Sequence, residues 1–97
     1  MHKERAMCKD YREIRQDITQ GRTAEAMEKL DAALAFRPDD ATLHYLRGNV
    51  FRKQGRWSDA INCYLKAEAI DPASPAAEAR AMLDDIFAFY NKDMYNQ

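Results

Sequence analysis

The sequence contains few residues that break helices, build strands or cross membranes. Its 97 residues include three glycines, three prolines and a single valine. Because alternating β-branched runs are absent, a β-sheet is not predicted. No stretch approaches the roughly 20 apolar residues that a membrane-spanning helix needs. The first ten residues, MHKERAMCKD, are charged and lack the apolar core of a signal peptide, so we expect a cytoplasmic protein.

Cysteine and histidine are also scarce. Cys8 and Cys63 are distant in the sequence and lack CxxC spacing, and His2 and His44 are isolated from them. A metal site would need three or four converging ligands, so no metal is predicted. In a reducing compartment such cysteines are more often small buried apolar residues than partners in a disulfide.

Charge of one sign does not predominate, and catalytic motifs are absent. Fifteen Lys and Arg nearly cancel sixteen Asp and Glu, so the chain lacks the strongly basic character typical of nucleic-acid-binding domains. There is no glycine-rich phosphate loop, nucleophile elbow or HExxH. Asp84 and Asp85 are adjacent, hence about 100° apart on a helix, and are expected on a solvated face. Neither an enzyme nor a cofactor is predicted.

The chain does contain an internal repeat. GRTAEAMEKLDAALAFRP (21–38) and GRWSDAINCYLKAEAIDP (55–72) superpose without a gap. The identical pairs are Gly21/Gly55, Arg22/Arg56, Ala26/Ala60, Ala33/Ala67, Ala35/Ala69 and Pro38/Pro72. A repeat period of about 34 residues, with two helices per unit, is typical of helix-turn-helix solenoids.

Local chemistry predicts five antiparallel helices, over about 3–20, 23–36, 40–54, 58–71 and 74–90. The expected N-cap residues are Thr23, Asp39 or Asp40, Ser58 and Ser74. Pro75 after Ser74 suits a first helical turn. Gly55 is expected to take the left-handed conformation that ends the third helix.

The second unit, 41–74, resembles a tetratricopeptide repeat over its whole length. The matching residues are Gly48, Phe51, Gly55, Trp57, Ala60, Tyr64, Ala67 and Pro72. The first unit, 7–40, matches mainly in its second helix, through Gly21, Ala26, Leu30, Ala33 and Pro38. Residues 75–90 resemble the capping helix of such arrays, and 91–97 form a tail. The resemblance, to small bacterial-type proteins of two repeats, implies an all-α, right-handed solenoid in one domain, 1–97.

Both units depart from the motif in their first helices. Ile14 stands where the motif has its small residue, and His44 and Arg47 replace its tryptophan and leucine. We expect Leu43 and Leu46 to supply the missing apolar face. Gly48 is expected to let the paired helices approach closely, which offsets its cost of about 1 kcal/mol in helix propensity. Large residues, namely Leu30, Phe51, Trp57 and Tyr64, should fill the space between repeats.

The resemblance implies a function in protein–protein interaction, with a partner segment bound in the concave groove formed by the first helix of each unit and the fifth helix. The residues expected to face this groove are Cys8, Tyr11, Arg12, Arg15, Ile18, Thr42, Tyr45, Asn49, Arg52, Lys53, Ala79, Arg80, Leu83 and Phe87. Among them, Tyr11, Arg12, Arg15, Tyr45, Asn49, Arg52, Arg80 and Phe87 are the predicted peptide-binding set.

This surface is predicted to be basic and free of acids, which favours an acidic peptide, because guanidinium groups pair bidentately with carboxylates. Asn49 is expected to bond a peptide backbone through both amide atoms. Alternatively, the arginines lie on a solvated face and their stems only cover apolar surface. RNA is disfavoured because two repeats are too few to bind it base by base.

A structural, self-associating module is the alternative function. The apolar residues of 79–90 cover an arc of about 160°, wider than a capping helix needs. A second subunit in a twofold contact or the tail is expected to cover the excess. The possible dimer contacts are Phe89, Tyr90, Met94 and Tyr95.

Overall fold

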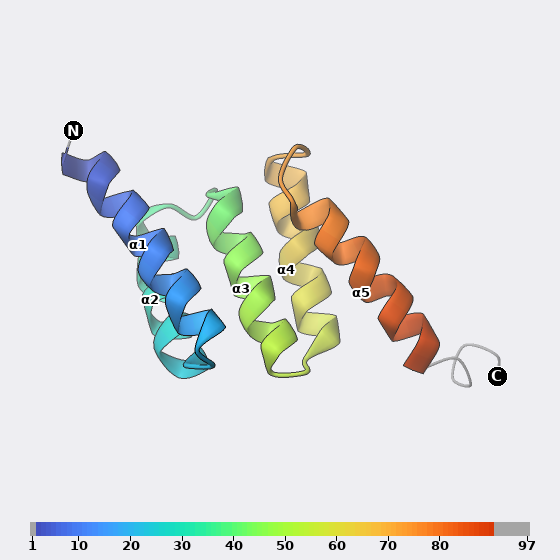
Figure 1. Cartoon of the computed structure of the whole chain (residues 1–97). Helices are drawn as coiled ribbons and strands as arrows, with labels where there is room; N and C mark the ends of the chain where they lie inside the picture. Colours follow the sequence, from blue (N-terminus) through green and yellow to red (C-terminus); the bar gives the residue numbers. More distant parts are fainter. Residues whose placement is uncertain (1, 91–97) are drawn as a thin grey trace.

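Five helices in a row make up the described part of the protein (Figure 1). The computed structural model describes the backbone of residues 2–90 and the side chains of residues 11–83. The helices are α1 (His2–Thr19), α2 (Thr23–Phe36), α3 (Ala41–Lys53), α4 (Trp57–Ile70) and α5 (Ala76–Tyr90). No strand occurs in residues 2–90. The prediction of an all-α helical repeat is confirmed, with boundaries within a residue or two of those expected.

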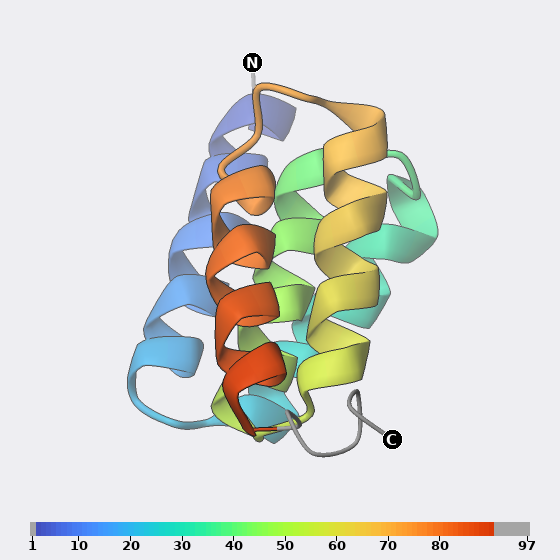
Figure 2. The same ribbon diagram turned by 90° about the vertical axis from the view of Figure 1, so that its right-hand side faces the viewer.

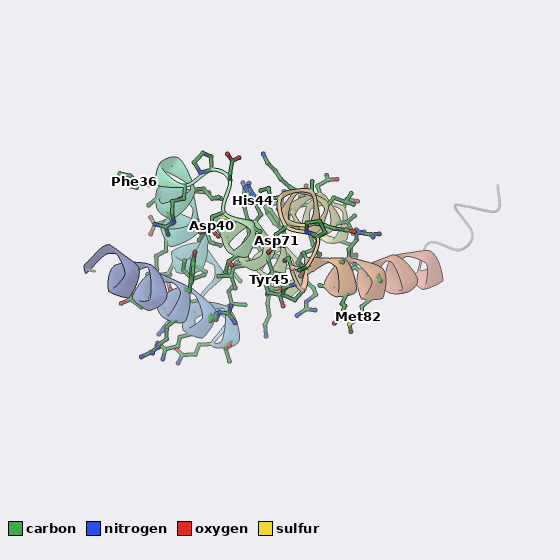
Figure 3. All side chains as sticks on the ribbon, turned by 90° about the horizontal axis from the view of Figure 1, so that it is seen from above. Phe36, Asp40, His44, Tyr45, Asp71 and Met82 are labelled. Atoms are coloured by element: carbon green, nitrogen blue, oxygen red, sulfur yellow. The ribbon has the colours of Figure 1, made fainter. Side chains whose placement is uncertain are left out.

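The helices pack mainly against their neighbours along the chain. Each repeat forms a hairpin, α1 with α2 and α3 with α4. The hairpins are joined through contacts of α3 with α2 and α1, and α5 packs on α4. The end-on view of Figure 2 shows the helices side by side, and from above α1 and α5 lie on one side of the row, α2 and α4 on the other (Figure 3).

Two apolar clusters hold this row together. The first lies between the hairpins and contains Ile14, Ile18, Ala26, Leu30, Ala33, Leu43, Leu46 and Val50. The second joins α3, α4 and α5 and contains Phe51, Ala60, Cys63, Tyr64, Ala67, Ala76, Ala79 and Leu83. Leu43 and Leu46 are buried, which confirms that they replace the apolar face lost at His44 and Arg47.

Gly48 allows a very close contact between two helices. A Cβ at this position would overlap Cδ1 and Cε1 of Tyr64, far inside van der Waals contact. The ring of Tyr64 is fully buried and cannot move away without disturbing the second cluster. The prediction that Gly48 permits close approach of α4 is therefore confirmed.

The helix ends agree only in part with the expected caps. The side chain of Asp40 accepts a hydrogen bond from the N–H of Leu43, and Ser74 accepts one from the N–H of Ala76, as predicted. Gly55 has φ +75°, which confirms its left-handed turn.

The caps predicted at Thr23 and Ser58 are wrong. The N-cap residues are Arg22 and Arg56, and neither side chain forms a capping hydrogen bond. Each arginine follows a left-handed glycine, and its N–H bonds a carbonyl of the preceding helix, Asp17 O or Phe51 O. Because of this turn, the N-cap of each helix lies earlier in the sequence than the predicted cap residue, Thr23 or Ser58.

Candidate ligand-binding groove

A groove of about 330 Å³ lies between α1 and α3. It is lined by Arg15, Ile18, Thr19, Tyr45, Leu46, Asn49, Arg52 and Lys53. On α3, Tyr45, Asn49 and Arg52 are spaced by four and three positions, so they share one face of the helix. Both helices are the first helices of their repeats, and so their exposed faces meet along one side of the array. Four residues of the predicted binding set thus lie together: Arg15, Tyr45, Asn49 and Arg52.

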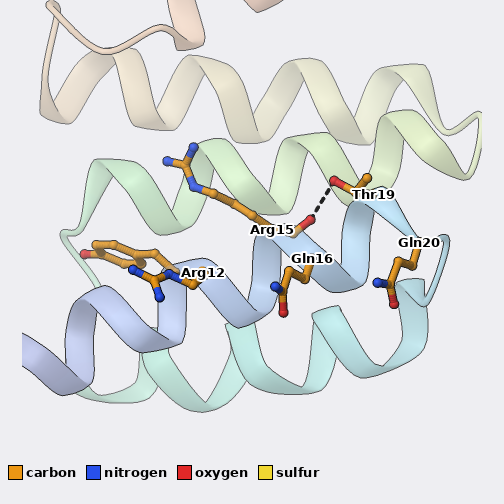
Figure 4. A pocket seen from close by; sticks show the side chains of 6 residues that line it. Arg12, Arg15, Gln16, Thr19 and Gln20 are labelled. Carbon is orange, nitrogen blue, oxygen red and sulfur yellow. Dashed lines mark hydrogen bonds between the residues drawn. The ribbon is translucent and has the colours of Figure 1, made fainter.

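A second hollow, of about 450 Å³, lies along α1 (Figure 4). Its lining residues are Tyr11, Arg12, Arg15, Gln16, Thr19 and Gln20. Arg15 and Thr19 belong to both hollows, so the groove continues across α1. In Figure 4 the side chain of Arg15 extends toward α3, whereas Gln16 and Gln20 point elsewhere. Arg12 and Tyr11, also in the predicted set, line this second hollow and not the groove.

The groove is basic, and its cations are not neutralised by the described part of the protein. Arg15, Arg52 and Lys53 line it, and no acidic residue does. Among residues 11–83, none of the three forms an ion pair. Other basic residues do: Lys29 Nζ lies 2.6 Å from Asp17 Oδ2, and Arg56 is paired in the same way with Asp59. Positive charge is therefore available in the groove.

Asn49 is held from behind by α4. The hydroxyl of the buried Tyr64 donates a hydrogen bond to Oδ1 of Asn49. The expectation that Asn49 offers both amide atoms to a peptide holds only in part, because one of the two lone pairs of its carbonyl oxygen already accepts a bond inside the protein. Its two N–H groups remain as donors for a ligand.

Two residues of the predicted set use their polar groups within the protein. The hydroxyl of Tyr11 donates to Asp40, and burial, together with this carboxylate, raises the pKa of Tyr11 to about 12. Arg80 Nε lies 2.8 Å from Glu68 Oε2 on α4. The expected surface without acids is therefore wrong at both positions, because chain segments remote in sequence supply carboxylates to them.

Other expectations for the groove are corrected by the packing of the helices. Ala79 and Leu83 pack against α4 in the second cluster and do not face a groove, and Thr42 lines neither hollow. Ile18 is 8% exposed and forms part of the groove's apolar lining while belonging to the first cluster. The side chains of the remaining candidates lie outside the described residues: Cys8, Asp84, Asp85, Phe87, Phe89, Tyr90, Met94 and Tyr95.

Some lining residues are not among those predicted from the sequence. They are Thr19 and Leu46 in the groove, and Gln16 and Gln20 in the second hollow. Thr19 follows Arg15 by one helical turn, and this spacing could have indicated it. Its hydroxyl donates to the carbonyl oxygen of Arg15 at 2.9 Å, and this bond orients the side chain (Figure 4).

The described residues show no other chemical centre. Cys63 is buried, and burial raises the pKa of its thiol. His44 is buried as well, with Nε2 2.8 Å from the carbonyl oxygen of Pro38. No group of metal-ligating side chains occurs in the described part of the chain. None of the described helices is long and apolar enough to span a bilayer.

Comparisons with known proteins agree with this architecture. The solution NMR structure of Bacteroides fragilis protein BF1650 is similar to this chain, with a TM-score of 0.81 and 43% sequence identity over 90% of this chain and 89% of that one. No protein with a curated description matches. The family model described as "Tetratricopeptide repeat" matches residues 11–75. Such repeats generally mediate protein–protein interaction. The chain belongs to the tetratricopeptide repeat family.

Proposed function

We propose that this protein is a non-catalytic adaptor or assembly factor that binds an acidic segment of another protein in the groove between α1 and α3. The family's general role in protein–protein interaction supports the class of function. The observation that supports the acidic ligand is the set of three cations, Arg15, Arg52 and Lys53, which line the groove without an ion-pair partner among the described residues. Its placement in the cytoplasm stays a prediction.

The chemistry of the groove favours carboxylates. Guanidinium groups form charge-assisted, often bidentate hydrogen bonds with them. Tyr45 adds contact area with a polar tip, and the buried side chains of Leu46 and Ile18 form the floor of the groove. Because the cations are solvent-exposed, their attraction to a ligand should weaken as ionic strength rises.

A fluorescein-labelled hexaglutamate peptide provides a direct probe, with fluorescence anisotropy as the measurement. Wild-type protein should bind the peptide at low salt. Its affinity should fall as sodium chloride is added, because added salt shortens the distance over which exposed charges attract one another. The double variant Arg15→Glu/Arg52→Glu should lose binding while its helical circular dichroism is retained.

The matched control is Lys66→Glu, which makes the same kind of charge reversal on the exposed face of α4, outside the groove. Because the Lys66 change reverses a single charge, it is compared with each single arginine variant. Equal loss in Lys66→Glu and Arg52→Glu would contradict a specific groove, since only net charge would then matter. Absence of hexaglutamate binding to the wild type would overturn the acidic ligand.

Self-association through α5 is the second candidate. Met82 on α5 is 60% exposed (Figure 3), which supports an apolar surface on the end helix. Sedimentation of the wild type and of Phe89→Asp tests this function. A dimer that dissociates in the variant would support it, and a monomeric wild type would overturn it.

A further inference from the structure

Tyr64 connects the second apolar cluster to the groove. Its ring lies against the backbone of α3, where Gly48 has no Cβ to exclude it. In this position the hydroxyl of Tyr64 reaches Asn49 and forms a hydrogen bond with it. Asn49 is the next residue along α3 and lines the groove. The ring also packs beside Tyr45, with centroids 5.8 Å apart. A fully buried residue of α4 therefore contacts two groove residues from behind.

The hydroxyl of Tyr64 determines how the amide of Asn49 is oriented. A buried O–H needs an acceptor, because an unsatisfied buried polar group costs free energy. Oδ1 of Asn49 accepts this bond. Burial raises the pKa of Tyr64 to about 12, so the phenol remains a proton donor at neutral pH. The carbonyl oxygen of Asn49 is thus bonded to Tyr64, and the two N–H groups remain for a ligand.

We infer that Tyr64 is a positioning residue for ligand specificity: it fixes Asn49 as a hydrogen-bond donor and so makes the groove select carboxylate over carboxamide side chains. This inference rests on the proposed function of the groove. A freely rotating Asn49 matches either ligand, because turning its amide exchanges donor and acceptor. A fixed Asn49 offers N–H donors, which a carboxylate meets with either of its two charged oxygens. A glutamine meets them only through its single neutral oxygen and its N–H₂ finds no acceptor on a fixed Asn49, so the carboxylate is preferred.

The first repeat has no equivalent of the hydrogen bond between Tyr64 and Asn49. When the two repeats are superposed, Leu30 corresponds to Tyr64 and Arg15 corresponds to Asn49. Leu30 has no hydroxyl, and Arg15 has no acceptor atom to orient. Arg15 is a donor by its chemistry, whereas Asn49 becomes one through its contact with Tyr64. Both repeats then present donors to the same groove by different means.

Tyr64→Phe tests the inference, because it removes one oxygen and keeps the ring against Gly48. The probes are labelled hexaglutamate and six versions in which one glutamate is replaced by glutamine. In the wild type, at least one replacement should weaken binding about tenfold, the effect of losing a charge-assisted hydrogen bond in a mismatched site. In Tyr64→Phe the same replacement should weaken binding only about two- to threefold. Ser58→Ala, which removes an exposed hydroxyl of α4 that lines neither hollow, should discriminate like the wild type.

A second measurement does not depend on binding. NMR relaxation of the side-chain N–H₂ of Asn49 should show higher order in the wild type than that of Asn62, which is exposed on α4. Tyr64→Phe should lower the order of Asn49 to that of Asn62. Equal order in the wild type would overturn the inference.

The outcomes separate the inference from the function on which it rests. If Arg15→Glu/Arg52→Glu abolishes hexaglutamate binding but Tyr64→Phe leaves the glutamate preference unchanged, the groove function stands and the role of Tyr64 is refuted. If Tyr64→Phe weakens all seven peptides by the same factor, Tyr64 is only structural and the inference is again refuted. If the wild type binds none of the peptides, both are refuted.

Discussion

The two repeats make the same helix–helix contact with different residues. In the second repeat, Gly48 has no side chain and the large ring of Tyr64 fills the space against α3. In the first, the corresponding residues are Ile14 and Leu30, two side chains of intermediate size that are both fully buried. In the second repeat, a side chain of α4 alone therefore fills the space between the two helices. In the first repeat, side chains of both helices fill it. The comparison shows that the pair of residues, and not either residue alone, determines the fit.

A second pair of positions differs in chemistry instead of size. Phe51 in the second repeat corresponds to Asp17 in the first. The guanidinium of Arg56 lies 4.9 Å from the ring centroid of Phe51, whereas the equivalent Arg22 has Nη2 3.1 Å from Asp17 Oδ1. The same turn arginine thus pairs with an aromatic face in one repeat and with a carboxylate in the other. The fold tolerates this exchange because both partners suit a guanidinium.

The largest expected effect comes from placing the first repeat's residue into the second. Gly48→Ile should destabilise the protein by about 3 kcal/mol, at the upper end of the range for overpacking, because its Cβ alone overlaps the ring of Tyr64. Urea denaturation followed by circular dichroism measures the loss.

The matching double variant tests whether the pair determines the fit. Tyr64→Leu alone should cost about 2 kcal/mol through the cavity that it leaves. Gly48→Ile/Tyr64→Leu, which copies the first repeat, should cost less than the two single changes added together. Additive losses would show that the contacts in the two repeats are not equivalent.

A smaller effect is expected at Asp17, and it should depend on pH. The side chain of Asp17 is 5% exposed, and hydrogen bonds from Lys29 and then Arg22 lower its pKa below the ordinary value of 3.8. A lowered pKa in the folded state stabilises the protein above pH 4, and this contribution disappears as the pH falls through the folded value.

Asp17→Asn should therefore lower the urea midpoint at pH 7 and flatten the loss of stability below pH 4. Asp31→Asn on the exposed face of α2 is the matched control and should change neither. If Asp17→Asn follows the wild-type acid profile, the ion pairs do not stabilise the fold. At the equivalent position of the second repeat, Phe51 has no ionisable side chain, so we expect no such pH dependence from that position.

Asp40 joins the two repeats, and its loss should also destabilise the protein. It caps α3 through the N–H of Leu43 and accepts a bond from Tyr11 on α1. Loss of an N-cap typically costs about 1 kcal/mol, and loss of the second bond adds to this. Asp40→Ala measured by urea denaturation tests the sum, with the neighbouring exposed Asp39→Ala as control. Equal stabilities of the two variants would contradict the cap.

Most of the fold could be predicted from the sequence because the internal repeat places Gly21 and Gly55, several alanines and two prolines at corresponding positions, and because the resemblance to the tetratricopeptide motif indicated the role of Gly48. The orientation of Asn49 and the pairing of Arg80 with Glu68 could not be predicted, because each depends on a side chain from another helix. The predicted caps at Thr23 and Ser58 are wrong because side-chain preference competes with the geometry of the turn. Here the glycine-arginine turn determines where the helix begins.

The smallest difference between the repeats is expected at their turns. Gly21 and Gly55 have φ +81° and +75°, and a Cβ at either position would meet nothing within 4 Å. Replacement by alanine therefore costs only the left-handed backbone conformation, about 1 kcal/mol at each position. Gly21→Ala and Gly55→Ala should lower the free energy of unfolding equally in urea denaturation, in contrast to Gly48→Ala, where the steric overlap with Tyr64 adds to the loss. Unequal values for the two turns would mean that they differ in more than backbone conformation, since packing around the missing Cβ is absent in both.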